Sequence, residues 1–194
     1  KILAQAVSEL KKEELQDAPQ ESPQKASLLA DGRIFVDECV LDSDLPMSFS
    51  EEYVPTSAER MLLYRELDAL QTDEEVQAFR KRMLDRFGTI PPEGEELMRV
   101  VALRRLGCYF GAERIVLKKG RMRLYFVHDA DSPFFRSHAF DQIISFATTN
   151  VHRCRLQEVD GRRSLLVSEV TTVRTAVELL THISLCGSHS TLLP

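Results

Sequence analysis

The spacing of apolar residues changes along the chain, and each spacing predicts a different kind of structure. In residues 1–15 the apolar side chains recur at helical intervals, and the polar stretch with two prolines that follows predicts a linker. Residues 33–42 are rich in β-branched and apolar side chains, which is typical of a strand. We therefore expect a domain end and linker in residues 1–30, one main domain in 31–186 and a disordered tail in 187–194.

Between residues 56 and 110 the helical spacing returns and predicts three consecutive helices. Thr56 with Glu59, and Thr72 with Glu75, have the spacing of a capping box and mark the first two helix starts. Gly88 ends the second helix, because glycine accepts the left-handed conformation of a C-cap, and two prolines follow soon after it. The three helices are expected over residues 57–70, 73–87 and 93–110.

From residue 113 onward apolar and polar positions alternate, and this period of two predicts strands. One hairpin is expected over residues 113–127, with its turn at Lys119-Gly120. A second hairpin is expected over residues 152–169, with its turn at Asp160-Gly161.

Two more helices complete the predicted pattern. Ser132 is a favourable N-cap and Pro133 a favourable first helical residue, so a helix is expected from there to about residue 149. A last amphipathic helix is expected over residues 172–185. The fold class that follows is α+β, with an antiparallel sheet from two hairpins plus an N-terminal strand, packed with about five helices.

Charge is unevenly distributed, although the net charge of −5 is modest. Residues 1–98 hold 11 Lys/Arg and 22 Asp/Glu, whereas residues 99–165 hold 13 and 6. An acidic helical part and a basic strand-rich part can face different partners. No apolar run approaches the roughly 20 residues of a membrane span. The four cysteines lie far apart, which argues against a zinc site built on cysteine pairs and fits a reducing cytoplasm.

The chain contains no pattern of residues that predicts catalysis. The segment Val36-Asp37-Glu38-Cys39 resembles the magnesium-binding strand of a nucleotide hydrolase, but the chain has no phosphate loop. The nearby His128, Asp131 and His138 do not converge by any regular geometry, and His152 with Cys154 on one strand face lacks further metal ligands. We expect no catalytic, cofactor-binding or metal-binding residues.

Basic residues are concentrated in the two predicted hairpins. The first hairpin carries Lys118, Lys119, Arg121 and Arg123, close to the aromatic pair Tyr125-Phe126. The second carries Arg153, Arg155, Arg162 and Arg163. Basic strands interleaved with aromatic residues can form a nucleic-acid surface, and this stays open beside the simpler reading that alternation places these cations on the solvated face.

The segment "RMLDRFGTIPPEGEEL", residues 82–97, predicts a helix that ends sharply, a turn and a second helix. Asp85 and Arg86 lie in the last helical turn, Phe87 is expected in the core, and Gly88 follows. The physics of helix termination accounts for this corner, and it leaves two charged side chains held rigidly at a helix end.

Several motifs in order resemble one known family. "EEYVP", "ERMLLYRELD", "DEEVQAFRKRMLDRFGTIP" and "LRRLGCYFGAERIVLKKGRMRLYFV" are similar to the C-terminal domain of the bacterial transcription-repair coupling factor, and "AVSELK" resembles the last helix of the translocase core that precedes it. The resemblance implies that the parent protein is an ATP-driven translocase on double-stranded DNA. It would displace RNA polymerase stalled at a lesion and recruit the excision-repair protein UvrA. ATP and Mg would then belong to the parent and not to this segment.

The same resemblance implies a non-catalytic, regulatory role for this domain in DNA repair. It would pack on the N-terminal UvrA-binding module of the same cytoplasmic protein and mask that module until polymerase is engaged. An interdomain contact that must release favours charged residues, so Asp85 and Arg86 are the expected contact residues, with Glu52 and Arg60 as further candidates.

Overall fold

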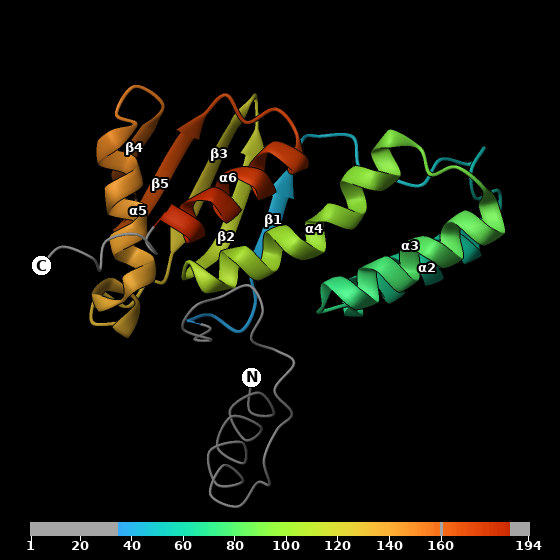
Figure 1. Cartoon of the computed structure of the whole chain (residues 1–194), viewed down its shortest axis with the longest axis horizontal. Coiled ribbons are helices and arrows are strands. Elements are labelled where there is room, and N and C mark those ends of the chain that lie inside the picture. Colours follow the sequence, from blue (N-terminus) through green and yellow to red (C-terminus); the bar gives the residue numbers. More distant parts are fainter. Residues whose placement is uncertain (1–34, 160, 187–194) are drawn as a thin grey trace, which may run out of the picture. The chain divides into compact units, whose positions relative to one another are not determined.

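The computed structural model of the chain describes residues 35–159 and 161–186. All of these residues belong to one compact unit (Figure 1). The helix predicted in 1–15, the linker up to residue 30 and the tail 187–194 lie outside the described residues. The predicted domain boundaries therefore stay predictions.

The described unit is built on a five-stranded mixed sheet, which confirms the α+β class. The strands lie in the order β1-β2-β3-β5-β4, and every neighbouring pair is antiparallel except β1 with β2, which is parallel. Their bounds are β1 Val40–Ser43, β2 Ala112–Lys118, β3 Arg121–Phe126, β4 Cys154–Val159 and β5 Arg162–Ser168.

The N-terminal strand begins later than its composition predicts. The backbone N–H of Phe35 donates to the carbonyl of Cys108 at 3.4 Å, so the segment ahead of the strand lies against the end of a helix and not in the sheet. Sheet pairing starts only at Val40, opposite Arg114. Asp37 lies before the strand and is exposed.

Both hairpins form where the alternation predicted them. In the β2–β3 turn Lys119 has φ 52° and Gly120 φ 68°. Two successive residues with positive φ define the type I′ turn, whose twist matches that of the flanking strands. Leu124 and Phe126 are completely buried, so the alternation of β3 points its apolar residues inward.

The helices agree with the predicted ranges except at one place. Their bounds are α2 Ser57–Ala69, α3 Asp73–Phe87, α4 Pro92–Tyr109, α5 His138–Thr149 and α6 Val173–Cys186. The continuous helix predicted from Ser132-Pro133 is wrong, because a short 3₁₀ turn, η2 (Pro133–Arg136), comes first. Ser137 then takes an extended conformation and accepts a hydrogen bond from the N–H of Phe140 at 3.3 Å, which starts α5 afresh.

The main core lies between the sheet and three helices. Figure 1 shows α4, α5 and α6 in front of the strands, and the opposite face of the sheet carries the alternate, partly exposed residues. The inward-facing side chains of β2, β3 and β5 are buried on the side of the sheet where α6 lies, and so is the apolar face of α6. The fully buried members include Ile115, Met122, Leu124, Leu165, Val167, Ala176, Leu180 and Ile183.

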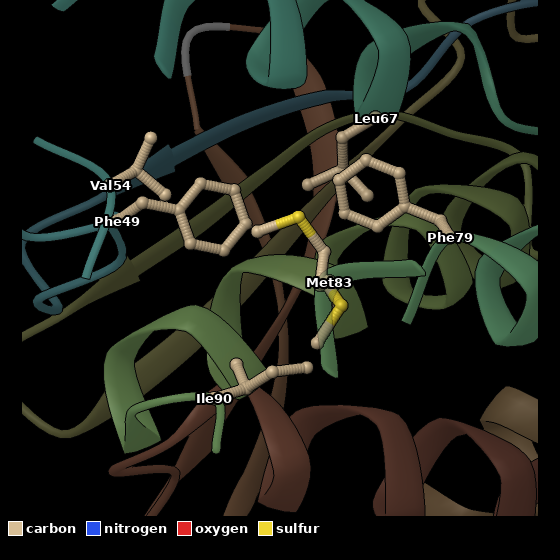
Figure 2. Close-up of a cluster of buried hydrophobic side chains, with 7 residues drawn as sticks. Phe49, Val54, Leu67, Phe79, Met83 and Ile90 are labelled. Atoms are coloured by element: carbon tan, nitrogen blue, oxygen red, sulfur yellow. The ribbon is translucent and has the colours of Figure 1, made fainter. Parts of the chain in front are cut away.

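A second, smaller core joins α2, α3 and the first half of α4. It contains Phe49, Val54, Leu67, Phe79, Met83, Ile90 and Met98 (Figure 2). Phe87, which was expected in the core, is partly buried at the border of this cluster. Helix α4 contributes Met98 to the second core and Leu103 to the main one, so both cores depend on the same helix.

We expect Gly111→Ala to destabilise the domain by about 2–4 kcal/mol in urea unfolding. Gly111 has φ 60°, and an added Cβ would lie 2.6 Å from the buried ring of Phe134. The matched control is Gly161→Ala, because Gly161 has φ 70° but nothing within 4 Å of the added atom. It should lose only about 1 kcal/mol for its backbone conformation. Equal losses for both variants would show that the contact with Phe134 does not matter.

Candidate functional site

The candidate site lies on a hairpin of two helices, α2 and α3, which we call the helical arm (residues 57–87). The predicted capping box at the start of α3 is confirmed. The Thr72 hydroxyl accepts from the N–H of Glu75 at 3.2 Å, and the Glu75 carboxylate accepts from the N–H groups of Thr72 at 3.0 Å and Gln71 at 2.8 Å. These backbone donors lower the pKa of Glu75, with Gln71 contributing most.

The inner side of the arm is held to α4 by guanidinium groups. Arg80 makes a two-armed contact with Glu95, at 2.7 and 3.0 Å. Arg105 of α4 reaches Asp73 at 2.6 Å, at the start of α3. Arg104, also of α4, reaches Asp68 of α2 at 2.5 Å. Because each helix of the arm is tied to α4 in this way, the outer side of the arm is presented in a fixed orientation.

The outer side carries charges that pair across the two helices. Arg86 forms an ion pair with Glu59, and Arg82 forms one with Glu66. Leu62 lies on α2 between the two glutamates and its side chain is 65% exposed. We call this surface the arm face; it comprises Glu59, Leu62, Glu66, Arg82, Asp85 and Arg86.

Asp85 is the member of the arm face with the most freedom to bind a partner. It is exposed, and within the described part of the chain it makes no ion pair. It is spaced by three residues from Arg82 and adjoins Arg86, so all three lie on the same side of α3. Arg86 is exposed as well, but its guanidinium is already engaged with Glu59 and lies 5.1 Å from the ring centre of Phe87.

The corner after α3 is fixed by Tyr53. Its hydroxyl donates towards the carbonyl oxygens of Gly88 at 3.2 Å and Met83 at 3.3 Å, and its ring lies 5.6 Å from that of Phe87. Gly88 has φ 79°. The positive φ predicted at this C-cap is therefore present, and a distant tyrosine holds the end of the helix in place.

Glu52 and Arg60 do not belong to the arm face. Glu52 is exposed in the turn before α2. Arg60 donates to the carbonyl oxygens of Val54 at 2.7 Å and Pro55 at 3.1 Å and pairs with Glu51 at 3.0 Å, and its side chain is only 14% exposed. The guanidinium of Arg60 is thus engaged in bonds within the domain. These bonds do not favour the partner contact predicted for Arg60, which stays a prediction.

The capping box predicted at Thr56 is wrong. Thr56 occupies the N-cap position of α2, but its side chain makes no capping hydrogen bond. Glu59, the expected reciprocal partner, instead pairs with Arg86 on the other helix. The Glu59 carboxylate therefore forms an ion pair with a residue distant in sequence and not the capping hydrogen bond of the local motif.

Sequence reasoning missed Leu62. Leu63, Leu67 and the C-cap residue Leu70 lie at helical spacing along α2, and this stripe faces the core: Leu67 is buried and the other two pack against the second core. An additional leucine outside the periodic stripe, flanked by glutamates on the same side of the helix, is the signal that would have found it.

The basic residues of the hairpins divide between different surfaces. Lys118, Arg121 and Arg123 belong to the outward positions of β2 and β3, whereas Lys119 sits in the turn. On the second hairpin Arg163 lies 4.5 Å from the ring centre of Phe135 and Arg153 pairs with Glu169 at 3.1 Å. Some of the predicted basic residues, such as Arg163 and Lys119, therefore lie away from the outward positions of the strands.

The remaining candidates for chemistry stay apart. Among residues 35–159 and 161–186, no group of three or more His, Cys, Asp or Glu could hold a metal ion. His152 lies in the turn before β4, so the strand face predicted for it with Cys154 is wrong. Burial raises the pKa of the Cys39 thiol to about 12. Within the same ranges, none of the helices has the length and apolar character that crossing a bilayer requires.

Fold and surface together define a small α+β domain that presents a rigid helical arm. The model of the TRCF domain family matches residues 43–137, which include the arm, α4 and the first hairpin. A solved crystal structure of the C-terminal domain of a transcription-repair coupling factor covers 76% of this chain and 94% of its own, with TM-score 0.58 and 15% identity. At that identity the likeness establishes the fold alone.

Curated relatives carry the same name. The chain is 26% identical over 133 residues to the transcription-repair-coupling factor of Rickettsia conorii, covering 64% of the chain and 11% of that protein. It is 36% identical over 62 residues to that of Rickettsia typhi, covering 32% and 6%. The chain thus matches only about a tenth of the length of these relatives, or less. Residues 43–137 match the TRCF domain family, and the fold is similar to that of the C-terminal domain of a transcription-repair coupling factor.

We expect Thr72→Ala to cost about 1 kcal/mol of unfolding free energy, because the first N–H groups of α3 lose their acceptor. Thr56→Ala is the matched control, since Thr56 holds the same position in α2 without a capping bond. Urea unfolding followed by circular dichroism measures both. A loss at Thr56 as large as that at Thr72 would contradict the observed caps.

We expect the contribution of the Glu75 charge to vary with pH. Its pKa in the folded chain lies below the ordinary 4.5, so the charge stabilises the fold above that pH, and the effect disappears as pH falls through the lowered value. Glu75→Gln should therefore reduce stability more at pH 7 than at pH 3, which lies below the ordinary pKa. Glu74→Gln, an exposed neighbour in the same helical turn, is the control. An equal effect of Glu75→Gln at both pH values would refute the assignment.

Proposed function

We propose that this domain is the regulatory C-terminal part of an ATP-dependent DNA translocase that couples transcription to nucleotide-excision repair. It acts without catalysis of its own, by covering the UvrA-binding surface of the N-terminal module of the same protein until RNA polymerase is engaged. The match of residues 43–137 to the TRCF domain family supports this role, and so do relatives named as transcription-repair-coupling factors. ATP, Mg and double-stranded DNA are then ligands of other parts of the parent protein, which works in the cytoplasm.

The observation that carries the proposal is the arm face. An autoinhibitory contact must be specific yet able to open, and interfaces of that kind are small and polar. The arm face combines interhelical ion pairs with one exposed leucine, Leu62. An apolar anchor surrounded by charges provides affinity from the anchor and orientation from the charges.

Asp85 and Arg86 contribute differently to this contact. Asp85 makes no ion pair within the described residues, so a cation on the partner module would be its first. Arg86 already pairs with Glu59 on the other helix, and this ion pair fixes the positions of the charged groups on the arm face. Reversing Arg86 would place two carboxylates together and disturb the arm itself, whereas reversing Asp85 tests the contact more cleanly.

We expect the chain to bind the separately produced N-terminal UvrA-binding module of the same protein in calorimetric titration. Leu62→Ala should weaken this binding by about 1–2 kcal/mol, because the anchor is lost. Asp85→Lys should weaken it as well and reduce its sensitivity to salt. Arg86→Glu is measured alongside, with unfolding curves to separate loss of contact from loss of the arm.

Arg155→Glu on strand β4 is the matched control, since it reverses an exposed charge far from the arm along the chain and should leave binding unchanged. A weak contact is amplified by joining the two modules with a flexible linker and following energy transfer between dyes. Binding that is unaffected by Leu62→Ala and Asp85→Lys would move the contact to another surface. No contact in either format would refute the autoinhibitory role.

A further inference from the structure

The face of the sheet opposite α4, α5 and α6 has a composition unlike that of a simply solvated surface. We call it the open face. Pairing register fixes its members, because residues directly opposite each other on neighbouring strands point to the same side. One row across the sheet is Val116, Arg123, Leu166 and Arg155, and the next is Arg114, Tyr125, Ser164 and Gln157. In a third row Lys118 lies opposite Arg121, and Arg162 is the first residue of β5.

Cations outnumber anions on the open face. Six basic side chains lie there: Arg114, Lys118, Arg121, Arg123, Arg155 and Arg162. Two acids accompany them. Asp42 pairs with Lys118 at 2.7 Å and with Arg114 at 2.9 Å, and Glu113 pairs with Arg162 at 3.2 Å. Lys118 and Arg114 together lower the pKa of Asp42, so this acid stays ionised and neutralises only part of their charge.

Three arginines of the open face make no ion pair within the described ranges. They are Arg121, Arg123 and Arg155. Arg123 and Arg155 lie on either side of Leu166 in one row of the sheet. Arg121 lies on the same strand as Arg123, two residues before it. The unpaired cations are thus grouped over the centre and one side of the sheet, where they are available to anionic groups of a ligand.

The centre of the open face also carries apolar and aromatic surface. Tyr125, Val116 and Leu166 are each partly exposed on the three central strands. The guanidinium of Arg123 lies 5.8 Å from the ring centre of Tyr125. A partly exposed aromatic ring beside unpaired guanidinium groups is the combination on which a nucleic-acid base can stack while its phosphates meet cations.

We propose that the open face binds single-stranded nucleic acid, with phosphates on Arg121, Arg123 and Arg155 and a base stacked on Tyr125. A single strand is favoured over a duplex because, within residues 35–159 and 161–186, this face carries no helix that could enter a groove. A duplex would use only the cations, whereas a single strand uses the aromatic and apolar centre as well. The open face shares no residue with the arm face, so this activity does not depend on the autoinhibitory role.

The test uses fluorescence anisotropy of the whole 194-residue chain with 5′-fluorescein-labelled dT12 and rU12 and with a 12-base-pair DNA duplex. Three to six phosphate contacts predict a slope of log affinity against log salt of about −2 to −4 for the single strands. Arg123→Gln should reduce the magnitude of that slope by about 0.7. The double variant Arg121→Glu/Arg123→Glu should bind about tenfold or more weakly, and Tyr125→Ala about fivefold or more weakly.

Arg65→Glu is the matched control, because it reverses an exposed charge on α2 and should leave binding unchanged. Circular dichroism confirms that each variant is folded. Tighter binding of dT12 than rU12, or the reverse, identifies which strand the face prefers, and either supports the proposal. It is overturned by absence of binding at 50 mM salt, by equal weakening in Arg65→Glu, or by a duplex bound more tightly than the single strands with no effect of Tyr125→Ala.

Discussion

Helix α4 (Pro92–Tyr109) is the element on which the rest of this domain depends, because it is packed along its whole length against two different cores. Met98 near its start belongs to the core of the helical arm, while Leu103 and Leu106 belong to the core under the sheet. A helix exposed on one side usually serves one core. Because α4 is one continuous helix, the position of the sheet fixes the position of the arm. Glu96 extends this role, since its carboxylate accepts from the N–H groups at the start of α6 and so links the third helix of the layer.

The charges of the arm divide into two sets with different consequences. Those facing α4, such as Arg80 with Glu95, are partly shielded from solvent and fix the arm as one body with that helix. In the pairs that face outward the arginine side chains are more exposed, at 61% for Arg82 and 67% for Arg86, and exposed pairs contribute little to stability in water. The outward-facing charged side chains contribute little to the stability of the fold, so they are available to contact another molecule. The division explains how a strongly charged hairpin can be both rigid and open to a partner.

The sequence predicts most of the elements and few of their long-range contacts. The periodicity of Val76, Phe79 and Met83 located α3, and the alternation along β3 located the buried face of the sheet, because both signals are local. The parallel pairing of β1 was beyond prediction, since it depends on a partner in another part of the chain. Only some residues of the arm face could be predicted from the sequence. Asp85 and Arg86 could be located from helix termination and family resemblance, whereas the pairing of Arg86 with Glu59 and the exposure of Leu62 depend on how two helices lie together.

The parallel pairing of β1 also sets an order of events as the polypeptide is made. Val40 pairs with Arg114, 74 residues further along, and the arm and α4 lie between them in the chain. Synthesis proceeds from the N-terminus, so β1 leaves the ribosome long before β2 exists. The helices of the arm form from local contacts and need not wait, whereas the sheet closes only after a long loop has been brought together. During that interval the nascent chain carries the helical arm beside an unpaired strand, and completion of β2 ends the exposure of that strand.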